Sequence, residues 1–299
     1  MPDAGVKKVL VVGDVIDDVI VVPHGPIRSD TDTVSDIRFS AGGSAGNTAS
    51  WLGHTGSDVT FVGMVGHADV PRHSAEFERY GVTPRLQSHP TLPTGAIIVL
   101  VDVLSHPERR SMLTERGAND AIDLSAIEVE GFAALHLTGY SLFKIVDAAP
   151  VVALIARARA AGLEVCVDPG SAGFLADYGV ERFLAAIAGA TILVPNLEEG
   201  QLLTGLTDPT EVAAALSTRF PLVALTLDRA GVLLAAAGSP PVSVPATSTT
   251  IVDPTGAGDA FTAGFLGAYL ASGDAVAAAA TGATLASRAV SALGARPIA

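Results

Sequence analysis

The sequence is poor in cysteine, which limits the covalent chemistry available to its fold. Cys166 is the one cysteine among 299 residues, so a disulfide within the chain is excluded. It stands in a strand-like apolar stretch, where a thiol usually serves as a small core side chain. A reducing, cytoplasmic environment fits this composition.

Positive charge and long apolar segments are also scarce. Lys and Arg number 18 against 31 Asp and Glu, a net charge of −13, so neither nucleic acid nor an anionic membrane is an expected partner. The longest uncharged run, residues 230–252, contains three prolines and many Ser and Thr residues, so we do not interpret it as a membrane span. The N-terminal apolar segment at 9–13 is too short for the core of a signal peptide. A soluble protein is expected.

Aromatic residues make up only 5% of the chain, yet 49% of it is hydrophobic and 16% charged. This composition is too apolar for disorder, and the length suits one large α/β domain with an accessory piece. From residue 134 onward, strand-like and helix-like segments alternate, which predicts a parallel sheet with crossover helices. The strands are expected at 135–139, 165–169 and 192–196, and the helices at 147–161 and 180–188.

Four strand-like segments fall outside this alternation. Residues 19–22 and 36–40 flank a loop rich in Pro, Gly and Asp, and residues 94–101 and 109–113 flank a charged turn. We interpret the four segments as a small separate sheet.

This small sheet is expected to form a lid within a single domain that spans 1–299. Its segments are placed at about 14–40 and 92–114. The strand at 96–101 is too apolar to be wet on both faces, so one face is expected to cover a pocket. The other face also needs a cover. We therefore predict a homodimer in which the lid sheets of two chains pair under two-fold symmetry.

A glycine-rich turn near the C-terminus leads into an apolar helix. A strand-like segment ends at Val252, and the turn Gly256-Ala257-Gly258 then leaves the backbone free of large side chains. The first amides of a helix lack intrahelical partners and lie at the positive end of its dipole, so this turn suits an anion. Asp259 in the first turn is either a cap or, beside a phosphate, a base that takes a proton from a hydroxyl.

Other polar stretches stand at predicted strand ends and helix starts. They are Asp14 with Asp18, Gly42-Gly43 with Asn47, Asn196 with Glu199, and Thr226 with Gly231. The chain contains neither G-x-G-x-x-G nor G-x-x-x-x-G-K-[ST], which excludes a Rossmann dinucleotide site and a P-loop. Phosphates must therefore be held in another way.

The stretch from Asp253 to Asp259, D-P-T-G-A-G-D, resembles the C-terminal signature of the ribokinase-like (PfkB) family, D-T-x-G-A-G-D, with Pro254 in place of a commoner Thr. Three earlier stretches resemble further elements of the family in the same order. Gly42-Gly43 with Asn47 resembles G-G-x-x-x-N, Asn196 with Glu199 resembles N-x-x-E, and Thr226 with Gly231 resembles T-L-G-x-x-G, with Asp228 where Gly is usual. The resemblance spans nearly the whole chain. It implies a three-layer α-β-α fold with a mostly parallel sheet and a β-sheet lid, and a kinase that transfers the ATP γ-phosphate to a primary hydroxyl of a sugar.

The resemblance also assigns roles by position. Asp259 is the general base, and the amides of Gly256, Ala257 and Gly258 form the anion hole. The acceptor lies against Asp14, Asp18, Gly42, Gly43 and Asn47. ATP lies along Asn196, Thr226, Gly231 and Gly258, with Mg²⁺ bound through water by Glu199. A K⁺ site corresponds to the carbonyls of Asp253, Thr255, Ala289, Ala292 and Gly294.

The acceptor stays open at this stage. Thr138 stands where some ribose-specific relatives have Glu. A nucleoside kinase would use the same motifs with a base pocket from the lid, for which Phe39, Phe143 and Met112 are candidates. A non-catalytic sugar- or nucleotide-binding regulator is the alternative from another class, but it would be expected to lose Asp259 or the glycines.

Two groups of charged or titratable side chains have simple surface interpretations. Arg109, Arg110 and Arg116 could clamp a phosphorylated or acidic acceptor, or could be the ordinary arginines of a solvated hairpin tip. His67 and His73 are expected on the surface, because no third metal ligand with suitable spacing accompanies them.

Overall fold

One large sheet organises the chain, whose computed structural model describes residues 7–101, 110–142 and 147–298. Within these residues the sheet has nine strands in the order β15-β14-β13-β12-β11-β10-β1-β4-β6. Neighbours from β13 to β6 run parallel, whereas β14 and β15 are antiparallel additions at one edge. The bounds are β1 Lys8–Val12, β4 Asp58–Val62, β6 Val82–Pro84, β10 Ala134–Thr138, β11 Glu164–Asp168, β12 Ile192–Leu193, β13 Leu222–Thr226, β14 Val232–Ala236 and β15 Val242–Val244. The predicted, mostly parallel sheet is confirmed.

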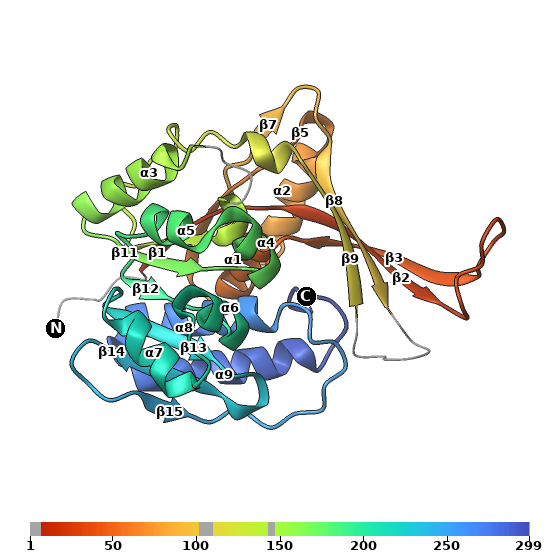
Figure 1. Ribbon diagram of the computed structural model, residues 1–299. Helices are drawn as coiled ribbons and strands as arrows, with labels where there is room; N and C mark the ends of the chain where they lie inside the picture. Colours follow the sequence, from red (N-terminus) through yellow and green to blue (C-terminus); the bar gives the residue numbers. More distant parts are fainter. Residues whose placement is uncertain (1–6, 102–109, 143–146, 299) are drawn as a thin grey trace.

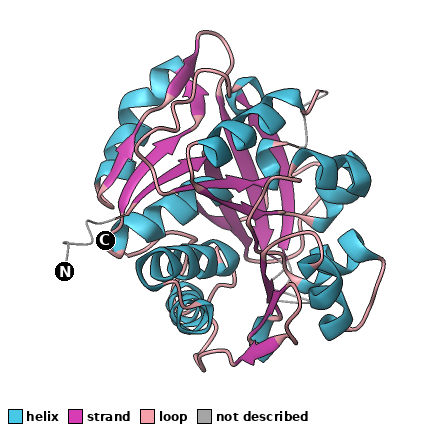
Figure 2. Ribbon diagram, turned by 90° about the vertical axis from the view of Figure 1, so that its left-hand side faces the viewer, coloured by secondary structure: helices cyan, strands magenta, loops and turns pink. Residues whose placement is uncertain are grey.

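Helices cover both faces of this sheet and make three layers (Figure 2). Leu10 and Val12 of β1 belong to one buried cluster with residues of helices α3 to α7, and Val9 and Val11 belong to a second with residues of α1, α2, α8 and α9. A central strand is thus apolar on both faces, as a parallel sheet between helices requires. The bounds are α1 Ser44–His54, α2 Val70–Glu78, α3 Ala149–Ala160, α4 Ala172–Tyr178, α5 Val180–Ala186, α6 Leu197–Thr204, α7 Pro209–Ser217, α8 Ala257–Ser272 and α9 Ala275–Val290.

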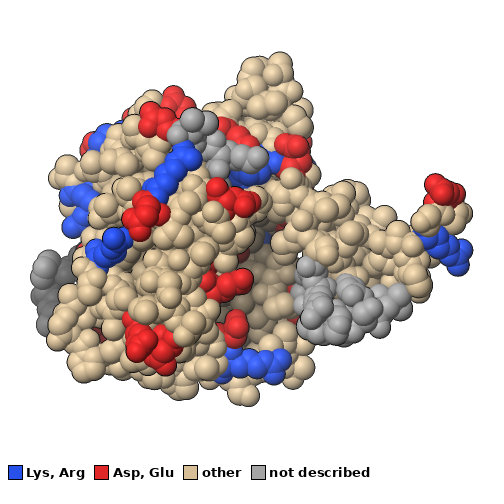
Figure 3. All heavy atoms as spheres, in the orientation of Figure 1, with Lys and Arg blue, Asp and Glu red and all other residues tan. Residues whose placement is uncertain are grey.

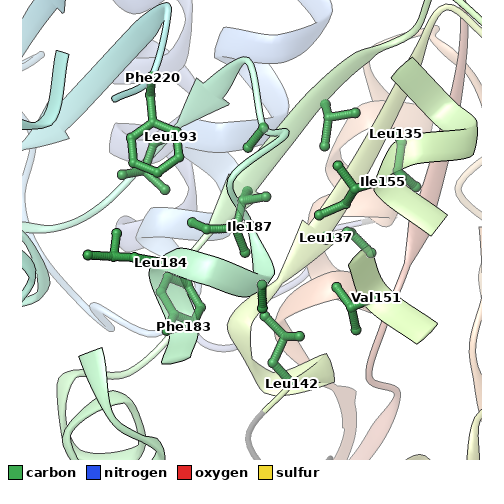
Figure 4. Packing of buried hydrophobic residues seen from close by; sticks show 14 of the residues in the cluster. Leu135, Leu137, Leu142, Val151, Ile155, Phe183, Leu184, Ile187, Leu193 and Phe220 are labelled. Atoms are coloured by element: carbon green, nitrogen blue, oxygen red, sulfur yellow. The ribbon is translucent and has the colours of Figure 1, made fainter. Parts of the chain in front are cut away.

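Close packing holds the helix layers against the strands. Figure 4 shows Leu135 and Leu137 of β10 facing Val151 and Ile155 of α3, and none of the four side chains is more than 2% exposed. Burying one such side chain contributes about 1.5–3 kcal/mol. The strand ends that carry the polar residues therefore stand on a rigid platform.

A second sheet stands apart from the body and projects from it (Figure 1). Within the described residues it has four strands in the order β3-β2-β8-β9, with β2 parallel to β8 and the other pairs antiparallel. The bounds are β2 Ile16–Pro23, β3 Ser35–Gly42, β8 Thr94–Val101 and β9 Arg110–Gly117; a small pair, β5 Met64–Gly66 and β7 Gln87–His89, forms a third sheet. The two chain segments predicted to form the lid do form one sheet, and the second segment extends to Gly117.

The register of the lid sheet defines an outer and an inner face. Val19 of β2 pairs with Phe39 of β3, so both side chains lie on one face together with Asp17. The Asp17 carboxylate accepts hydrogen bonds of 2.7 Å from Arg72 of α2, and we call this face the outer face. Asp18 points to the opposite, inner face.

His73 is buried, so its predicted surface position is wrong, whereas His67 is exposed as expected. None of the His73 side chain is exposed, and its imidazole lies 3.5 Å from the Asp17 carboxylate. Burial, together with the charge of the adjacent Arg72, lowers the pKa of His73 to about 4. The prediction rested on metal-ligand spacing, which carries no information on which side of a helix is buried.

Helices α8 and α9 approach each other through glycines. A Cβ atom on Gly264 would lie 2.9 Å from the Cα atom of Gly282, and one on Gly282 would lie 2.8 Å from the carbonyl oxygen of Phe261. At Gly264 the contact is therefore with backbone atoms alone, and no flexible side chain can move aside. It determines how deeply α8 sits beside the sheet.

Replacing Gly264 with Ala is expected to lower the free energy of unfolding by about 1–2 kcal/mol. Overpacking costs about 1–3 kcal/mol, and the higher helix propensity of Ala offsets only part of this. Chemical denaturation measures the difference. The control is Gly173→Ala in α4, where the nearest atom to an added Cβ is Ser171 Oγ at 3.9 Å, and stability should be unchanged or slightly higher. Equal stability of the two variants would contradict the close helix contact.

Candidate active site

Polar residues gather at the carboxyl edge of the main sheet. Asp14 follows β1, Thr138 and Asp168 end β10 and β11, and Asn196 follows β12. Thr138 pairs with Asp168, and Asn196 forms a bridge with Thr226. Parallel strands end at one edge, so these side chains share one rim. Figure 3 shows Asp and Glu side chains around the hollow between the body and the lid.

The N-terminus of α8 forms part of this hollow. Gly256 caps the helix in a left-handed conformation with a φ of 78°, and a Cβ there would lie 2.7 Å from Ala295. Only glycine suits both the backbone angle and the contact. Nothing lies within 4 Å of a Cβ atom built on Gly258, so the first turn is open on this side. The predicted turn therefore has the shape to receive an anion at the helix amides.

Asp259 lies in this first turn and is only 9% exposed. Its Oδ1 accepts a hydrogen bond of 2.6 Å from the Ser44 hydroxyl, and its Oδ2 accepts one of 2.8 Å from the Asn47 amide. Burial raises the pKa of Asp259 to about 6, although these two hydrogen bonds act in the opposite direction. The first turns of α1 and α8 are thus joined through one buried carboxylate.

Asp14, predicted to contact the acceptor, is engaged as a cap of α1. Its two carboxylate oxygens accept hydrogen bonds of 3.2 Å from the backbone amides of Ser44 and Ala45, and Oδ1 also accepts one of 3.3 Å from Thr138. The residue is 4% exposed. This geometry explains how the Gly42-Gly43 turn is fastened to β1, and contact of Asp14 with the acceptor stays a prediction.

Asp18 lies directly above the glycine turn. A Cβ atom on Gly42 would come within 2.1 Å of an Asp18 carboxylate oxygen, so Gly42 leaves the room that this side chain occupies. Gly43 has a φ of 87° and would collide with the carbonyl oxygen of Asp14 if it carried a side chain. Burial raises the pKa of Asp18 to about 7, against the opposing charge of Arg296.

Arg296 was not identified from the sequence, and it completes this cluster. It is 9% exposed, its Nε donates to Asn47 Oδ1 at 3.3 Å, and its Nη2 donates to the Gly42 carbonyl at 3.1 Å. Because the Asn47 oxygen accepts from Arg296, its amide nitrogen is left to donate to Asp259. A lone arginine near the end of the chain carries no sequence signal for this contact.

Of the residues predicted for the nucleotide, Asn196 follows β12, Thr226 ends β13, Gly231 directly precedes β14, and Gly258 lies in the first turn of α8. Asn196 caps α6 with Glu199 in a reciprocal capping box, with hydrogen bonds of 2.9 Å in both directions. Glu199 is 2% exposed, and burial raises its pKa to about 7. Gly231 has a φ of 97°, and an added Cβ would meet the Val244 carbonyl oxygen at 2.1 Å. Asp228, at the position where Gly is usual, also has a positive φ, of 48°.

Two further residues of the rim were not predicted. Burial raises the pKa of Asp168, and the carboxylates of Glu199 and Asp259 raise it further. Tyr140, just after β10, packs beneath Gly170, whose added Cβ would lie 2.9 Å from the tyrosine ring. Asp168 ends β11 and Tyr140 follows β10, so both stand at strand ends, the same signal that singles out Asp14 and Asn196.

The loop predicted to bind K⁺ is tied to the C-terminal segment. Asp253 Oδ1 accepts from the Thr255 amide at 2.9 Å, and its Oδ2 accepts from the Gly294 amide at 3.1 Å. Ala289 and Ala292 lie at the end of α9 and are joined by a backbone hydrogen bond. The structure therefore brings the five positions into one neighbourhood, with Asp253 as the link.

Not every hollow of the molecule belongs to this site. A cavity of about 790 Å³ lies against the outer face of the lid, between α2 and the C-terminal segment, and is lined by Asp17, Phe39, Arg72 and Arg296 among others. Asp14, Asp18, Gly42, Gly43 and Asn47, which are predicted to bind the acceptor, do not line it, whereas Phe39, a candidate for a base pocket, does. Among the described helices, none is long and apolar enough to cross a membrane.

A three-layer α/β body, a separate β lid and a glycine turn beside a buried carboxylate define a class of kinase that acts on small alcohols. The sequence matches the pfkB family carbohydrate kinase profile over residues 6–299, and the chain belongs to this family. It is accordingly an ATP-dependent phosphotransferase with an alcohol group as acceptor.

Relatives in sequence have related names. A protein named uncharacterized sugar kinase from Archaeoglobus fulgidus is 28% identical over 249 residues, which cover 82% of this chain and 96% of that protein. The bifunctional protein HldE of Erwinia tasmaniensis is 31% identical over 294 residues, which cover 92% of this chain and 57% of HldE. The chain therefore spans little more than half the length of that relative.

Solved structures share the fold. The adenosine kinase of Sinorhizobium meliloti superposes with a TM-score of 0.86 at 23% identity, covering 98% of this chain and 96% of that one. The ribokinase of Thermotoga maritima superposes with a TM-score of 0.79 at 21% identity, covering 97% and 94%. At these identities the similarity establishes the fold alone, and it does not distinguish a sugar from a nucleoside as acceptor.

Replacing Ser44 with Ala is expected to raise the pKa of Asp259 by about one unit. The lost hydrogen bond favours the charged carboxylate, and a bond to a charged group contributes about 1.5 kcal/mol or more. The pKa is measured by NMR titration of ¹³C-labelled aspartate, with Asp259→Asn used for assignment. Ser50→Ala is the matched control, because the Ser50 hydroxyl donates to the Gly46 carbonyl within α1. A fall in the pKa, or an equal rise in both variants, would contradict the assignment.

Proposed function

We propose that this kinase transfers the γ-phosphoryl group of ATP to a primary hydroxyl of a sugar, with Asp259 as the general base. The observation that carries the proposal is the position of Asp259, a buried carboxylate in the first turn of α8 next to the open side of Gly258. With a pKa of about 6, it is largely ionised at neutral pH and still accepts a proton.

The carboxylate of Asp259 and the amides of the helix N-terminus have different roles in the reaction. The acceptor oxygen bonds to the γ-phosphorus as the bond between that phosphorus and the ADP oxygen breaks, and the hydroxyl proton passes to Asp259. A carboxylate offers about four lone-pair positions, so the bonds from Ser44 and Asn47 leave room for the acceptor hydroxyl. The amides of residues 256–258 face the charge on the transferring group, where positioning and electrostatics provide most of the catalysis.

The lid and the strand ends supply the two binding regions of this proposal. Asp18 accepts hydroxyls of the sugar, which lies against Gly42 and Gly43. Asn47 acts through Asp259, because its amide already donates to that carboxylate. ATP lies along Asn196 after β12, Thr226 at the end of β13 and Gly231 before β14.

The carboxylates of the rim fit a divalent cation. Mutual repulsion contributes to the raised pKa of Asp168, which lies near Glu199 and Asp259. Within the described residues no group of three or more His, Cys, Asp or Glu can hold an ion directly. Mg²⁺ beside phosphates keeps several waters, so binding through water by Glu199, with Asp168 nearby, suits this set. Bound there, Mg²⁺ would neutralise phosphate charge. The K⁺ site at 253–255 and 289–294 stays a prediction. The cytoplasmic location also stays a prediction.

A nucleoside is the second candidate acceptor, and the lid offers it little aromatic surface. Phe39 is on the outer face and cannot stack on a base in the cleft. Met112 is on the inner face and 54% exposed, and Phe143 lies outside the described residues. These positions favour a sugar. The remaining alternative, a non-catalytic regulator, does not fit a member of a kinase family that retains Asp259.

Replacing Asp259 with Asn is expected to reduce kcat by about 10²- to 10⁴-fold with little change in ATP binding, because the amide cannot accept the hydroxyl proton. The assay measures ADP release with a panel of sugars, sugar phosphates and nucleosides, and calorimetry measures ATP affinity. Asp274→Asn is the control, since Asp274 only caps α9 and Asn also caps helices. A variant at position 259 with more than half of the parent kcat would remove Asp259 from the role.

We further propose that the outer face of the lid pairs with a second copy of the chain. Four large apolar side chains of this face are 40% to 80% exposed: Ile37, Phe39, Ile98 and Leu113. Light scattering over a dilution series should find twice the 30.2 kDa of one chain. Phe39→Asp should weaken this association, and Met112→Asp, on the inner face, should not. A single species of one-chain mass at micromolar concentration would overturn the dimer and leave the kinase assignment intact.

A further inference from the structure

Arg116 occupies the inner face of the lid, beside the proposed acceptor position. The register between β8 and β9 places Arg116 opposite Gly95, because the flanking pairs are Thr94 with Gly117 and Ala96 with Glu115. Gly95 also pairs with Ile16 of β2, so Ile16, Gly95 and Arg116 lie in one row across the sheet. Ile16 shares a face with Asp18, two residues along. The Cα atoms of Arg116 and Asp18 are therefore roughly 12 Å apart, from the spacing of two strands and two residues.

The side chain of Arg116 is buried, unlike an arginine of a solvated hairpin tip. It is 6% exposed, and its guanidinium carbon lies 5.8 Å from the centre of the Tyr140 ring. Its Nε donates to Asp120 at 2.9 Å. No described residue forms a hydrogen bond with the two terminal nitrogens. Arg109 and the side chain of Arg110 lie outside the described residues.

Asn119 holds Arg116 in place relative to the active site. Its Nδ2 donates 2.9 Å hydrogen bonds to the carbonyls of Arg116 and Val15, and its Oδ1 accepts one of 2.9 Å from the Val15 amide. Val15 directly follows Asp14, which caps α1. The base of β9 and the end of β1 thus form one hydrogen-bonded frame, and the guanidinium is positioned before any ligand arrives.

The side chain of Arg116 is 6% exposed, and among the described residues its terminal nitrogens have no hydrogen-bond partner. Withdrawing a charge from water is costly unless its hydrogen bonds are replaced, and the ion pair with Asp120 uses only Nε. The two remaining nitrogens form the planar fork that matches a carboxylate or phosphate. The nearby carboxylates are Asp14, Asp18 and Asp259, and the other cation, Arg296, already donates to Asn47 and Gly42, so Arg116 can provide selectivity that these groups cannot.

We propose that the acceptor is an anionic sugar, a sugar acid or a sugar phosphate, whose anionic group binds the terminal nitrogens of Arg116 while its far end presents the reacting hydroxyl to Asp259. This inference rests on the proposed kinase function. Asp18 accepts the sugar hydroxyls that lie between the anionic group and the reacting hydroxyl. The distance of roughly 12 Å between the Cα atoms of Asp18 and Arg116 leaves room for both side chains and the anionic group.

The test compares three matched acceptors with ATP: a neutral aldohexose, its aldonic acid and its phosphate ester at carbon 1, all of which keep the primary hydroxyl at carbon 6 free. The parent enzyme should have a higher kcat/KM for at least one anionic form than for the neutral sugar, and the pair of anions identifies whether carboxylate or phosphate is preferred. Arg116→Met should lower kcat/KM for that anion by about 10- to 100-fold and leave the neutral sugar within about twofold. Arg116→Lys, which keeps the charge and loses the fork, should lie between.

The controls separate this inference from the kinase proposal and from a purely structural role. Arg85→Met removes an exposed arginine paired with Glu128 at 3.4 Å and should change none of the three values. If Arg116→Met lowers turnover of neutral and anionic acceptors equally, or if the parent prefers the neutral sugar, the inference is overturned. If the enzyme releases ADP with none of the acceptors, the proposed function fails. Calorimetry then measures the binding of the same compounds and decides the role of Arg116. Weaker binding of the anion by Arg116→Met would support it, and unchanged binding would refute it.

Discussion

The site depends on one buried carboxylate shared by the first turns of two helices. Asp259 of α8 accepts hydrogen bonds from Ser44 and Asn47 of α1, more than 200 residues earlier in the chain. A buried charge is tolerated only where polar partners replace water, so both helix starts must be fixed before Asp259 can be placed. Asp14 fastens α1 to the sheet, and the close contact of α8 with α9 fixes α8.

The same constraint explains the electrostatics of the cleft. Burial raises the pKa values of Asp18, Glu199 and Asp259 to between about 6 and 7, so carboxylates that would be fully ionised in water titrate near neutrality. Carboxylates whose pKa values are raised together in one cleft are typical of functional sites. Arg296 and Arg116 are the buried cations that balance these carboxylates, the first inside the catalytic frame and the second at the lid.

Much of the fold could be predicted because its signals are local. Alternating apolar segments after residue 134 indicate a parallel sheet, and the interrupted strands before it indicate a separate lid. The glycine turn at 256–258 indicates a helix start open to an anion. The side of the lid strand on which Asp17 and Asp18 fall could not be predicted, because that depends on where α2 and the main sheet lie. The buried position of His73 was missed for the same reason.

The sequence by itself determined the elements and the chemistry at their ends, since backbone periodicity, glycine turns and strand-end carboxylates act over a few neighbouring residues. Tertiary structure alone decided which of those polar groups share one buried environment. Asp14 became a helix cap, Arg296 was brought from the end of the chain to Asn47, and Arg116 was buried over the ring of Tyr140. The physical reason is that burial and hydrogen-bond partnership are set by contacts between distant segments, which no local pattern encodes.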